Sequence, residues 1–196
     1  MKMIDDKLKI AVFASGNGSN AENIIRFFRE KGSGGEVVLV VCNRREAGVV
    51  GRAAALGVDV AILSRDELAD SERVLAMFDA RGVNCVVLAG FLLMVPPYLI
   101  RRYEGRMVNI HPSLLPKFGG KGMYGHHVHE AVVAAGECET GITVHLVSEE
   151  YDKGQILFQA RVAVAPGDTA ADVERKVREL EMRFFPGVIA RLGSDD

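Results

Sequence analysis

Short apolar runs alternate with amphipathic segments through the first part of the chain. The apolar runs are rich in β-branched residues and contain no polar alternation, a pattern typical of strands covered on both faces. Five such strands are expected, at Lys9–Ala14, Glu36–Cys42, Val58–Leu63, Cys85–Ala89 and Met107–Ile110. The amphipathic segments predict helices at Ala21–Lys31, Ala47–Leu56 and Arg65–Arg81, each followed by a glycine suited to a left-handed helix end: Gly32, Gly57 and Gly82.

Beyond residue 110 the pattern changes. A glycine- and histidine-rich stretch occupies residues 111–129, and a short helix is expected at Glu130–Ala135. Two strands separated by a polar turn follow at Ile142–Val147 and Ile156–Val164, and a last helix runs from about Thr169 to Leu192, with Asp168 or Thr169 as its N-cap. This order predicts one α/β domain over residues 1–196, a doubly wound, mostly parallel, Rossmann-like sheet with an antiparallel C-terminal strand pair and a C-terminal helix.

Composition narrows the class of protein. The 196 residues are 48% hydrophobic and 26% charged, which is typical of a globular chain. The net charge of −2 lacks the basic surplus of a general nucleic-acid-binding protein, and no apolar stretch approaches the length of a membrane helix. Cys42, Cys85 and Cys138 are far apart and odd in number, which favours a reducing compartment. We therefore expect a cytoplasmic protein with no nucleic-acid or membrane partner.

The end of the first expected strand is a candidate phosphate-binding turn. Residues Ser15–Asn20 read SGNGSN and lead directly into a helix. Ligands of doubly wound sheets lie at the C-terminal ends of strands, where a helix N-terminus offers free backbone N–H groups and a positive dipole to an anion. The alternative is a tight turn in which Ser19 or Asn20 only caps the helix. The segment matches neither the P-loop nor the GxGxxG dinucleotide pattern.

A second candidate group lies at the end of the fifth expected strand. Asn109 interrupts an otherwise apolar strand, and His111 follows just beyond its end. Residues two apart on a strand point the same way, so both side chains should face one crevice. An amide and an imidazole side by side are donors for an oxygen that gains negative charge, and Pro112 and Pro116 stiffen the segment. The alternative is a capped strand end with a hydrogen-bonded histidine.

Two later polar segments have competing interpretations. In the acidic turn Glu149–Gly154, a carboxylate could orient or charge His111 or relay a proton, whereas the alternative is a solvated surface turn. The histidines His126, His127 and His129 are close in sequence, but no cysteine or carboxylate pattern accompanies them. We therefore expect them in a loop, with no metal site.

Three motifs together resemble the phosphoribosylglycinamide formyltransferases, the folate-dependent GAR transformylases of purine synthesis. The motifs are SGNGSN, NIHPSLLP, and GITVHLV followed by YDKGQIL, so the resemblance runs from the first strand into the last helix. NIHPSLLP is shared with a wider formyl-transfer superfamily and is therefore specific for the chemistry, whereas SGNGSN points to glycinamide ribonucleotide as the acceptor.

The resemblance implies formyl transfer from the co-substrate 10-formyltetrahydrofolate to the amine of glycinamide ribonucleotide, with no metal. The amine would attack directly, Asn109 and a protonated His111 would stabilise the oxyanion, and Asp152 would keep His111 charged. The implied acceptor-binding residues are Gly18, Ser19, Asn20, Arg178 and Glu181. The implied folate-binding residues are Leu92, Leu93, Met94 and Val95 together with Asn109 and Asp152, and His145 supports the site. Residues 1–105 would form the ribonucleotide-binding half, and residues 106–196 the catalytic and folate-binding half.

Two segments depart from the commoner family pattern. FGGKGMYGHHVH follows NIHPSLLP where a K(Y/F)PG run is more usual. DKGQIL stands where DGGP(I/V)I is commoner, so Lys153 and Gln155 alter the loop expected to close over the folate. A monomer and a homodimer are both compatible with the sequence.

Three other functions fit part of the sequence. Methionyl-tRNA formyltransferase shares NIHPSLLP but carries a basic C-terminal domain, for which 196 residues with a net charge of −2 leave no room. Formyltetrahydrofolate deformylase, a hydrolase, usually has an additional N-terminal domain, whereas the first strand here begins at Lys9, and it has no use for a phosphate-binding turn. A non-catalytic nucleotide-binding module would explain Ser15–Asn20 but not the set formed by Asn109, His111 and Asp152.

Overall fold

A single mixed sheet organises the chain. The computed structural model describes residues 7–30 and 34–193. In this part of the chain, seven strands are ordered β3-β2-β1-β4-β5-β6-β7. The pairs from β3 to β5 are parallel, and the pairs β5–β6 and β6–β7 are antiparallel. The strands are β1 Leu8–Phe13, β2 Gly35–Cys42, β3 Val60–Ile62, β4 Cys85–Leu88, β5 Met107–His111, β6 Glu139–Leu146 and β7 Ile156–Ala163. The predicted sheet is confirmed, and its antiparallel part begins at the β5–β6 pair.

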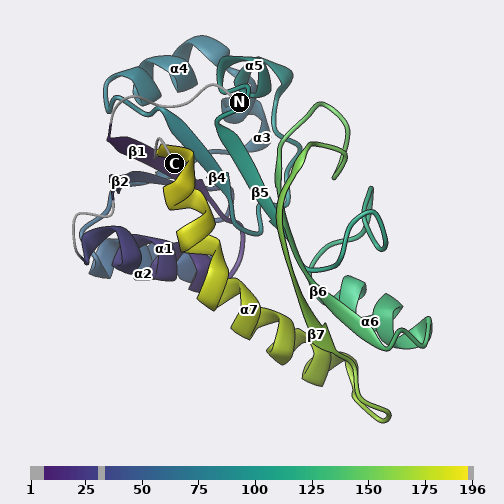
Figure 1. Cartoon of the computed structure of the whole chain (residues 1–196). Coiled ribbons are helices and arrows are strands. Elements are labelled where there is room, and N and C mark those ends of the chain that lie inside the picture. The colour runs from purple at the N-terminus through teal and green to yellow at the C-terminus, as the bar shows by residue number, and fades with distance from the viewer. Residues whose placement is uncertain (1–6, 31–33, 194–196) are drawn as a thin grey trace.

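Helices cover both faces of this sheet (Figure 1). One face packs against α1 Ser19–Arg29, α2 Gly48–Ala55, α6 His126–Ala134 and α7 Ala170–Ala190, which leads into a short 3-10 helix at Arg191–Gly193. The other face packs against α3 Arg65–Ala69, α4 Ser71–Asp79 and α5 Pro97–Arg102. This two-sided cover is the doubly wound arrangement that the order of elements predicted.

The central strand shows why the apolar runs lack polar positions. Ile10 and Val12 of β1 lie in one hydrophobic core, and Ala11 and Phe13 lie in the other. All four are completely buried. Because successive side chains of a strand point to opposite faces, a strand covered on both faces must be apolar at every position.

The helix boundaries differ from the prediction in three places. The expected helix Arg65–Arg81 is two helices, because Asp70 has an extended backbone (ψ 90°) and its carboxylate accepts a hydrogen bond from the Arg73 N–H, which starts α4. Helix α5 was not predicted; it starts at a Pro-Pro pair, where proline's missing N–H costs nothing. Helix α6 begins at His126, so the three histidines lie on a helix and not in the expected loop.

Other local predictions are confirmed. Gly57 and Gly82 have positive φ values of 61° and 65° at the ends of their helices. Thr169 caps α7 in a reciprocal capping box with Asp172. Gly32 and the expected helix end at Lys31 lie outside the described residues. Among those that are described, no helix is both long enough and apolar enough to cross a membrane.

Candidate active site

The C-terminal ends of β1, β4 and β5 open into a cavity of about 910 Å³. This volume is within the range typical of sites for small molecules. Every residue that the sequence analysis assigned to the site lines the cavity: Gly18, Ser19, Asn20, Leu92, Leu93, Met94, Val95, Asn109, His111, His145, Asp152, Arg178 and Glu181. The structure therefore brings together residues that are up to 163 positions apart in the chain, from Gly18 to Glu181.

The glycine-rich turn after β1 presents an uncapped helix N-terminus to this cavity. Gly18 is the N-cap residue of α1, with φ 80°, and no side chain caps the helix. A Cβ at Gly18 would lie 2.5 Å from Val49 Cβ and 2.6 Å from Val49 Cα, so only glycine fits. The first backbone N–H groups of an α-helix have no partner within the helix. Those of α1 remain available to an anion, and neither Ser19 nor Asn20 acts as the cap.

Helix α7 supplies two charged side chains beside this turn. Arg178 donates a hydrogen bond to Ser19 Oγ at 3.0 Å, and Glu181 accepts one from Asn20 Nδ2 at 2.9 Å. Burial raises the pKa of the Glu181 carboxyl, against the opposing effects of Asn20 and Arg178. The Asn20 Oδ1 atom is buried and has no hydrogen-bond partner within the described structure. The turn thus carries a cation, a carboxylate and an amide with an unused acceptor.

A cluster of polar side chains surrounds the end of β5. Asn109 and His145 face each other across the antiparallel β5–β6 pair, with 3.0 Å between Asn109 Nδ2 and His145 Nε2. His145 Nδ1 lies 2.8 Å from the Leu146 carbonyl and donates to it. With one proton on the ring, Nε2 of His145 accepts from the Asn109 amide. The second N–H of that amide is left for another acceptor.

Asp152 links the two histidines of the cluster. Its Oδ2 lies 3.7 Å from His111 Nδ1, and its Oδ1 lies 3.5 Å from His145 Nε2. Burial acts to raise the pKa of the Asp152 carboxyl, but the adjacent His145 ring, the hydrogen bond from the Gly120 N–H and the proximity of His111 outweigh it and hold that pKa below its usual value. Asp152 is therefore a carboxylate at neutral pH.

His111 is buried and already has a partner for one ring nitrogen. Its Nε2 lies 2.7 Å from the Phe118 carbonyl, a distance that requires a proton on Nε2. Burial lowers the pKa of His111, and this effect exceeds the raising effects of Asp152 and the Phe118 carbonyl. Burial thus favours a neutral His111 ring in the free protein, whereas the resemblance implies a protonated ring while the oxyanion forms.

The two segments that contact His111 carry unusual backbone conformations. Phe118 and Asp152 have φ values of 55° and 53°, and they are the non-glycine residues with positive φ in the described chain. Such conformations cost about 1–3 kcal/mol each and occur preferentially at functional sites. Here each one directs a hydrogen-bonding group, a carbonyl or a carboxylate, toward the His111 ring.

An apolar part of the cavity is exposed to solvent. The loop after β4 is held to the end of β1, because the Leu92 N–H donates to the buried Ser15 Oγ at 2.9 Å. Large apolar side chains of three loops remain unusually exposed around this part: Leu92 (46%), Met94 (58%), Tyr124 (50%) and Tyr151 (46%). Val95, by contrast, is buried. Exposed apolar surface of this kind is typical of a ligand-binding or interaction site.

The cavity also contains residues that the sequence analysis did not assign to it. His129 of α6 and Glu174 of α7 are among the lining residues. His129 is 3% exposed, its Nδ1 has no hydrogen-bond partner in the described chain, and burial lowers its pKa. The sequence analysis placed the three histidines in a loop, whereas they lie on α6. Had that helix been recognised, helical spacing would have placed His129 on its inward face. Among the described residues, no group of histidine, cysteine and carboxylate side chains could hold a metal ion.

Known proteins resemble this chain in sequence and in structure. A family model described as formyl transferase matches residues 8–189. The phosphoribosylglycinamide formyltransferase of Bacillus subtilis (strain 168) is 34% identical over 188 residues, which cover 94% of this chain and 94% of that protein. The solved structure of phosphoribosylglycinamide formyltransferase from Brucella melitensis matches with a TM-score of 0.86 and 36% identity, covering 97% of this chain and 98% of that one.

The plant relatives are longer. The chloroplastic phosphoribosylglycinamide formyltransferase of Arabidopsis thaliana is 38% identical over 190 residues, which cover 94% of this chain but 65% of that protein. The chain similarly spans 60% of the relative from Vigna unguiculata. Because the family model covers nearly all of the chain and the bacterial relative is matched along almost its whole length, this chain belongs to the formyl transferase family.

Proposed function

We propose that this chain transfers the formyl group of 10-formyltetrahydrofolate to the amine of glycinamide ribonucleotide. The products are N-formylglycinamide ribonucleotide and tetrahydrofolate, as in de novo purine synthesis. The observation that carries the proposal is that one cavity is lined both by an uncapped helix N-terminus and by the cluster of Asn109, His111 and Asp152. Similarity to proteins named phosphoribosylglycinamide formyltransferase supports the choice of acceptor.

The acceptor's phosphate binds at the N-terminus of α1 in this proposal. The free N–H groups and the positive end of the helix dipole favour an anion there. Arg178, already within hydrogen-bond distance of Ser19, adds a positive charge. Glu181 and Asn20 then contact the polar groups between the phosphate and the amine, which matches the unused Oδ1 acceptor of Asn20.

The folate binds along the exposed apolar loops. Its ring system would cover the apolar side chains of residues 92–94, which remain partly exposed in the free protein, with the buried Val95 beneath them. Burying apolar surface contributes about 25 cal/mol per Å². The backbone of this loop, which Ser15 holds in place, supplies polar groups for the ring edge. In this proposal the formyl-bearing nitrogen lies beside Asn109 and Asp152, where it meets the acceptor's amine.

The chain's residues stabilise charge that forms during the attack. When the amine nitrogen bonds to the formyl carbon, the formyl oxygen becomes an oxyanion. The free N–H of the Asn109 amide donates to that oxygen, and His111 Nε2–H transfers its hydrogen bond from the Phe118 carbonyl to it. A single donor of this kind contributes about 10²–10³ in rate.

One proton must move while the bonds change. The attacking amine loses a proton, the bond between the formyl carbon and the folate nitrogen breaks, and that nitrogen gains a proton. Asp152, ionised at neutral pH, is the base that carries this proton through water. Its charge also favours the protonated form of His111 as the oxyanion develops, because His111 Nδ1 lies 3.7 Å from Asp152 Oδ2.

An absorbance assay tests the proposal. Purified protein is mixed with 10-formyltetrahydrofolate, with and without glycinamide ribonucleotide, and the release of deformylated folate is followed. We expect release that requires the ribonucleotide and that falls at least about 10²-fold in His111→Ala, with circular dichroism confirming that the variant is folded. Release without the ribonucleotide would instead identify a hydrolase. No release from a protein that still binds the ribonucleotide would leave a nucleotide-binding module.

A further inference from the structure

Helix α2 contacts the glycine-rich turn, although none of its residues lines the large cavity. Its Val49 N–H donates to the Gly16 carbonyl at 3.2 Å. One turn further along α2, Arg52 Nε donates to the Asn17 carbonyl at 2.9 Å, and Arg52 Nη2 donates to Asn17 Oδ1 at 3.2 Å. A Cβ at Gly48 would lie 2.8 Å from Asn17 Oδ1, so the turn and the helix are in tight contact. Asn17 is therefore held to α2 by its backbone and by its side chain.

The hydrogen bond from Arg52 to the Asn17 carbonyl sets the direction of the next backbone N–H. In a planar trans peptide, the C=O of one residue and the N–H of the following residue point in opposite directions. The peptide that joins Asn17 to Gly18 is trans. Because its carbonyl points toward Arg52, the Gly18 N–H points away from α2. The turn lines the large cavity and α2 does not, so this N–H points to the side where a ligand binds.

Arg52 also pairs with a carboxylate close to the proposed phosphate position. Glu22 lies in the first turn of α1, where its negative charge would repel an anion bound at the same helix end. Its Oε1 lies 2.8 Å from Arg26 Nη2, and its Oε2 pairs with Arg52 Nη1. Hydrogen bonds from Arg26 and Arg52 lower the pKa of the Glu22 carboxyl, so this group is ionised at neutral pH and its charge is balanced by two arginines.

The two arginines around Glu22 differ in one respect. Arg26 bonds to Glu22 and has no hydrogen bond to the turn in the described structure, whereas Arg52 bonds to both Glu22 and Asn17. A guanidinium presents its donors in a rigid planar fork, so one arginine can hold several acceptors in a fixed arrangement, which the ammonium group of a lysine cannot do. Arg26 and Arg52 therefore separate the balance of charge on Glu22 from the positioning of the turn.

We propose that Arg52 is a positioning residue for the phosphate of the acceptor. It acts through Asn17, by holding the Gly18 N–H toward the phosphate, and it keeps the charge of Glu22 balanced beside the same site. This inference rests on the proposed binding of the acceptor's phosphate at the N-terminus of α1. Arg52 does not line the cavity, so it does not touch the ligand, and Arg178 remains the cation that does.

Initial-rate kinetics of three variants tests this role. Arg52→Ala should raise the KM for glycinamide ribonucleotide at least about tenfold, whereas kcat and the KM for 10-formyltetrahydrofolate should stay within about twofold of the wild type. Arg26→Ala removes an equal charge from the same carboxylate and is the matched control, with a KM within about twofold of the wild type. Arg52→Lys keeps the charge and loses the fork, so its KM should lie between those of the wild type and Arg52→Ala.

Three results of these kinetics would overturn the proposal. The first is an unchanged KM for the ribonucleotide in Arg52→Ala. The second is an equal rise of that KM in Arg26→Ala, which would reduce the effect to the charge on Glu22. The third is a wild-type KM in Arg52→Lys, which would show that a positive charge suffices without the fork. Circular dichroism and thermal unfolding establish that each variant is folded under the assay conditions.

A binding measurement separates this inference from the proposed reaction. Glycinamide ribonucleotide is titrated into the ¹⁵N-labelled full-length protein without folate, so that no transfer takes place, and NMR follows the amide signals of Gly18 and Ser19. We expect saturable shifts in the wild type and in Arg26→Ala, and a Kd at least about tenfold higher in Arg52→Ala. Equal Kd values in the wild type and Arg52→Ala would refute the role of Arg52 even if the chain transfers formyl groups. Binding that depends on Arg52 in a protein that transfers no formyl group would support that role and refute the proposed function alone.

Discussion

The close contact between the glycine-rich turn and α2 makes Gly18→Ala the most informative single substitution. An alanine there must adopt φ 80°, which costs a residue with a Cβ about 1–2 kcal/mol. The new Cβ would also lie 2.6 Å from Val49 Cα, a backbone atom near the start of α2, so the turn or the helix must shift. Inserting a methyl group into a tightly packed region costs about 1–3 kcal/mol.

The two effects together predict that Gly18→Ala lowers the free energy of unfolding by about 2–5 kcal/mol. For a chain of this size that is a fall of about 4–20 °C in melting temperature. Because the shift displaces the first N–H groups of α1, the KM for glycinamide ribonucleotide should rise at least about tenfold, whereas folate affinity should change little. Thermal unfolding and initial-rate kinetics measure the two effects.

Gly51→Ala is the matched control. Gly51 lies two residues from Val49 in α2, does not line the large cavity, and nothing lies within 4 Å of a Cβ placed there. Alanine in a helix interior is favoured over glycine by about 0.5–1 kcal/mol, so this variant should be as stable as the wild type or more stable, with unchanged kinetics. If Gly18→Ala melted and turned over like Gly51→Ala, the assignment of this turn as a constrained phosphate-binding element would be wrong.

Three further substitutions or conditions test the rest of the site. Asn109→Ala should lower kcat about 10²–10³-fold with ribonucleotide binding nearly unchanged. The control, Asn23→Ala, removes an amide bonded to the Met182 carbonyl outside the cavity and should leave kcat intact. A kcat within a few-fold of wild type in Asn109→Ala would exclude the oxyanion role. Glu181→Gln should weaken ribonucleotide binding at least about tenfold in calorimetry without affecting folate, and equal affinity would remove Glu181 from the acceptor site. Burial lowers the pKa of both His111 and His129, so the unfolded chain binds their protons more tightly, and the free energy of unfolding should fall as pH drops below about 6.5. Urea titrations should show a smaller fall in His129→Gln than in the wild type. A wild-type free energy of unfolding that does not change over this pH range would contradict the buried neutral histidines.

Much of the fold followed from the hydrophobic pattern because the sheet is covered on both sides. Strands such as Glu36–Cys42 could be recognised as continuous β-branched runs, and glycines such as Gly57 marked the helix ends that the structure contains. The break at Asp70 was missed because apolar periodicity continues across it, although Ser64 and Asp70 are both helix-capping residues in retrospect. Capping signals therefore locate such a boundary better than periodicity does.

That the assigned site residues lie in one cavity could be predicted, but the protonation of His111 could not. Residue spacing on a strand was enough to place Asn109 and His111 on one side of β5. Burial lowers the pKa of His111 and outweighs the opposing effect of the Phe118 carbonyl, and both depend on how residues 112–118 fold back over the ring. Sequence spacing carries no information on this, because seven residues can return to a side chain in many ways.

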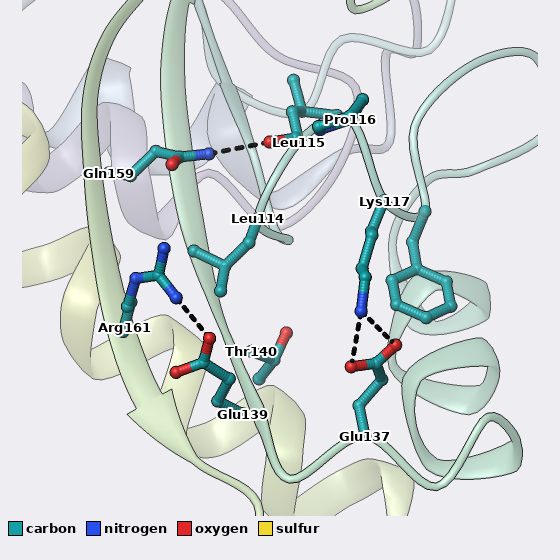
Figure 2. A pocket seen from close by; sticks show the side chains of 10 residues that line it. Leu114, Leu115, Pro116, Lys117, Glu137, Glu139, Thr140, Gln159 and Arg161 are labelled. Carbon is teal, nitrogen blue, oxygen red and sulfur yellow. Dashed lines mark hydrogen bonds and ion pairs between the residues drawn. The ribbon is translucent and has the colours of Figure 1, made fainter.

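A second, smaller cavity, lined by residues 114–118, the start of β6 and β7, likewise has no signature in the sequence (Figure 2). Lys117 and Glu137 are separated by 20 positions, and Arg161 and Glu139 by 22. Taken singly, each is an ordinary exposed charge. Only the packing of residues 114–118 against β6 and β7 brings them together.

Transfer of a labelled formyl group tests the central claim most directly. The protein is incubated with 10-[¹³C]formyltetrahydrofolate and glycinamide ribonucleotide, and the products are separated and analysed by mass spectrometry. The proposed function predicts that the ribonucleotide gains the labelled formyl group in an amount equal to the tetrahydrofolate formed, and that Asn109→Ala slows both in parallel. If the label were recovered as free formate while the ribonucleotide stayed unmodified, water and not the amine would be the acceptor, and the proposed transferase function would be wrong.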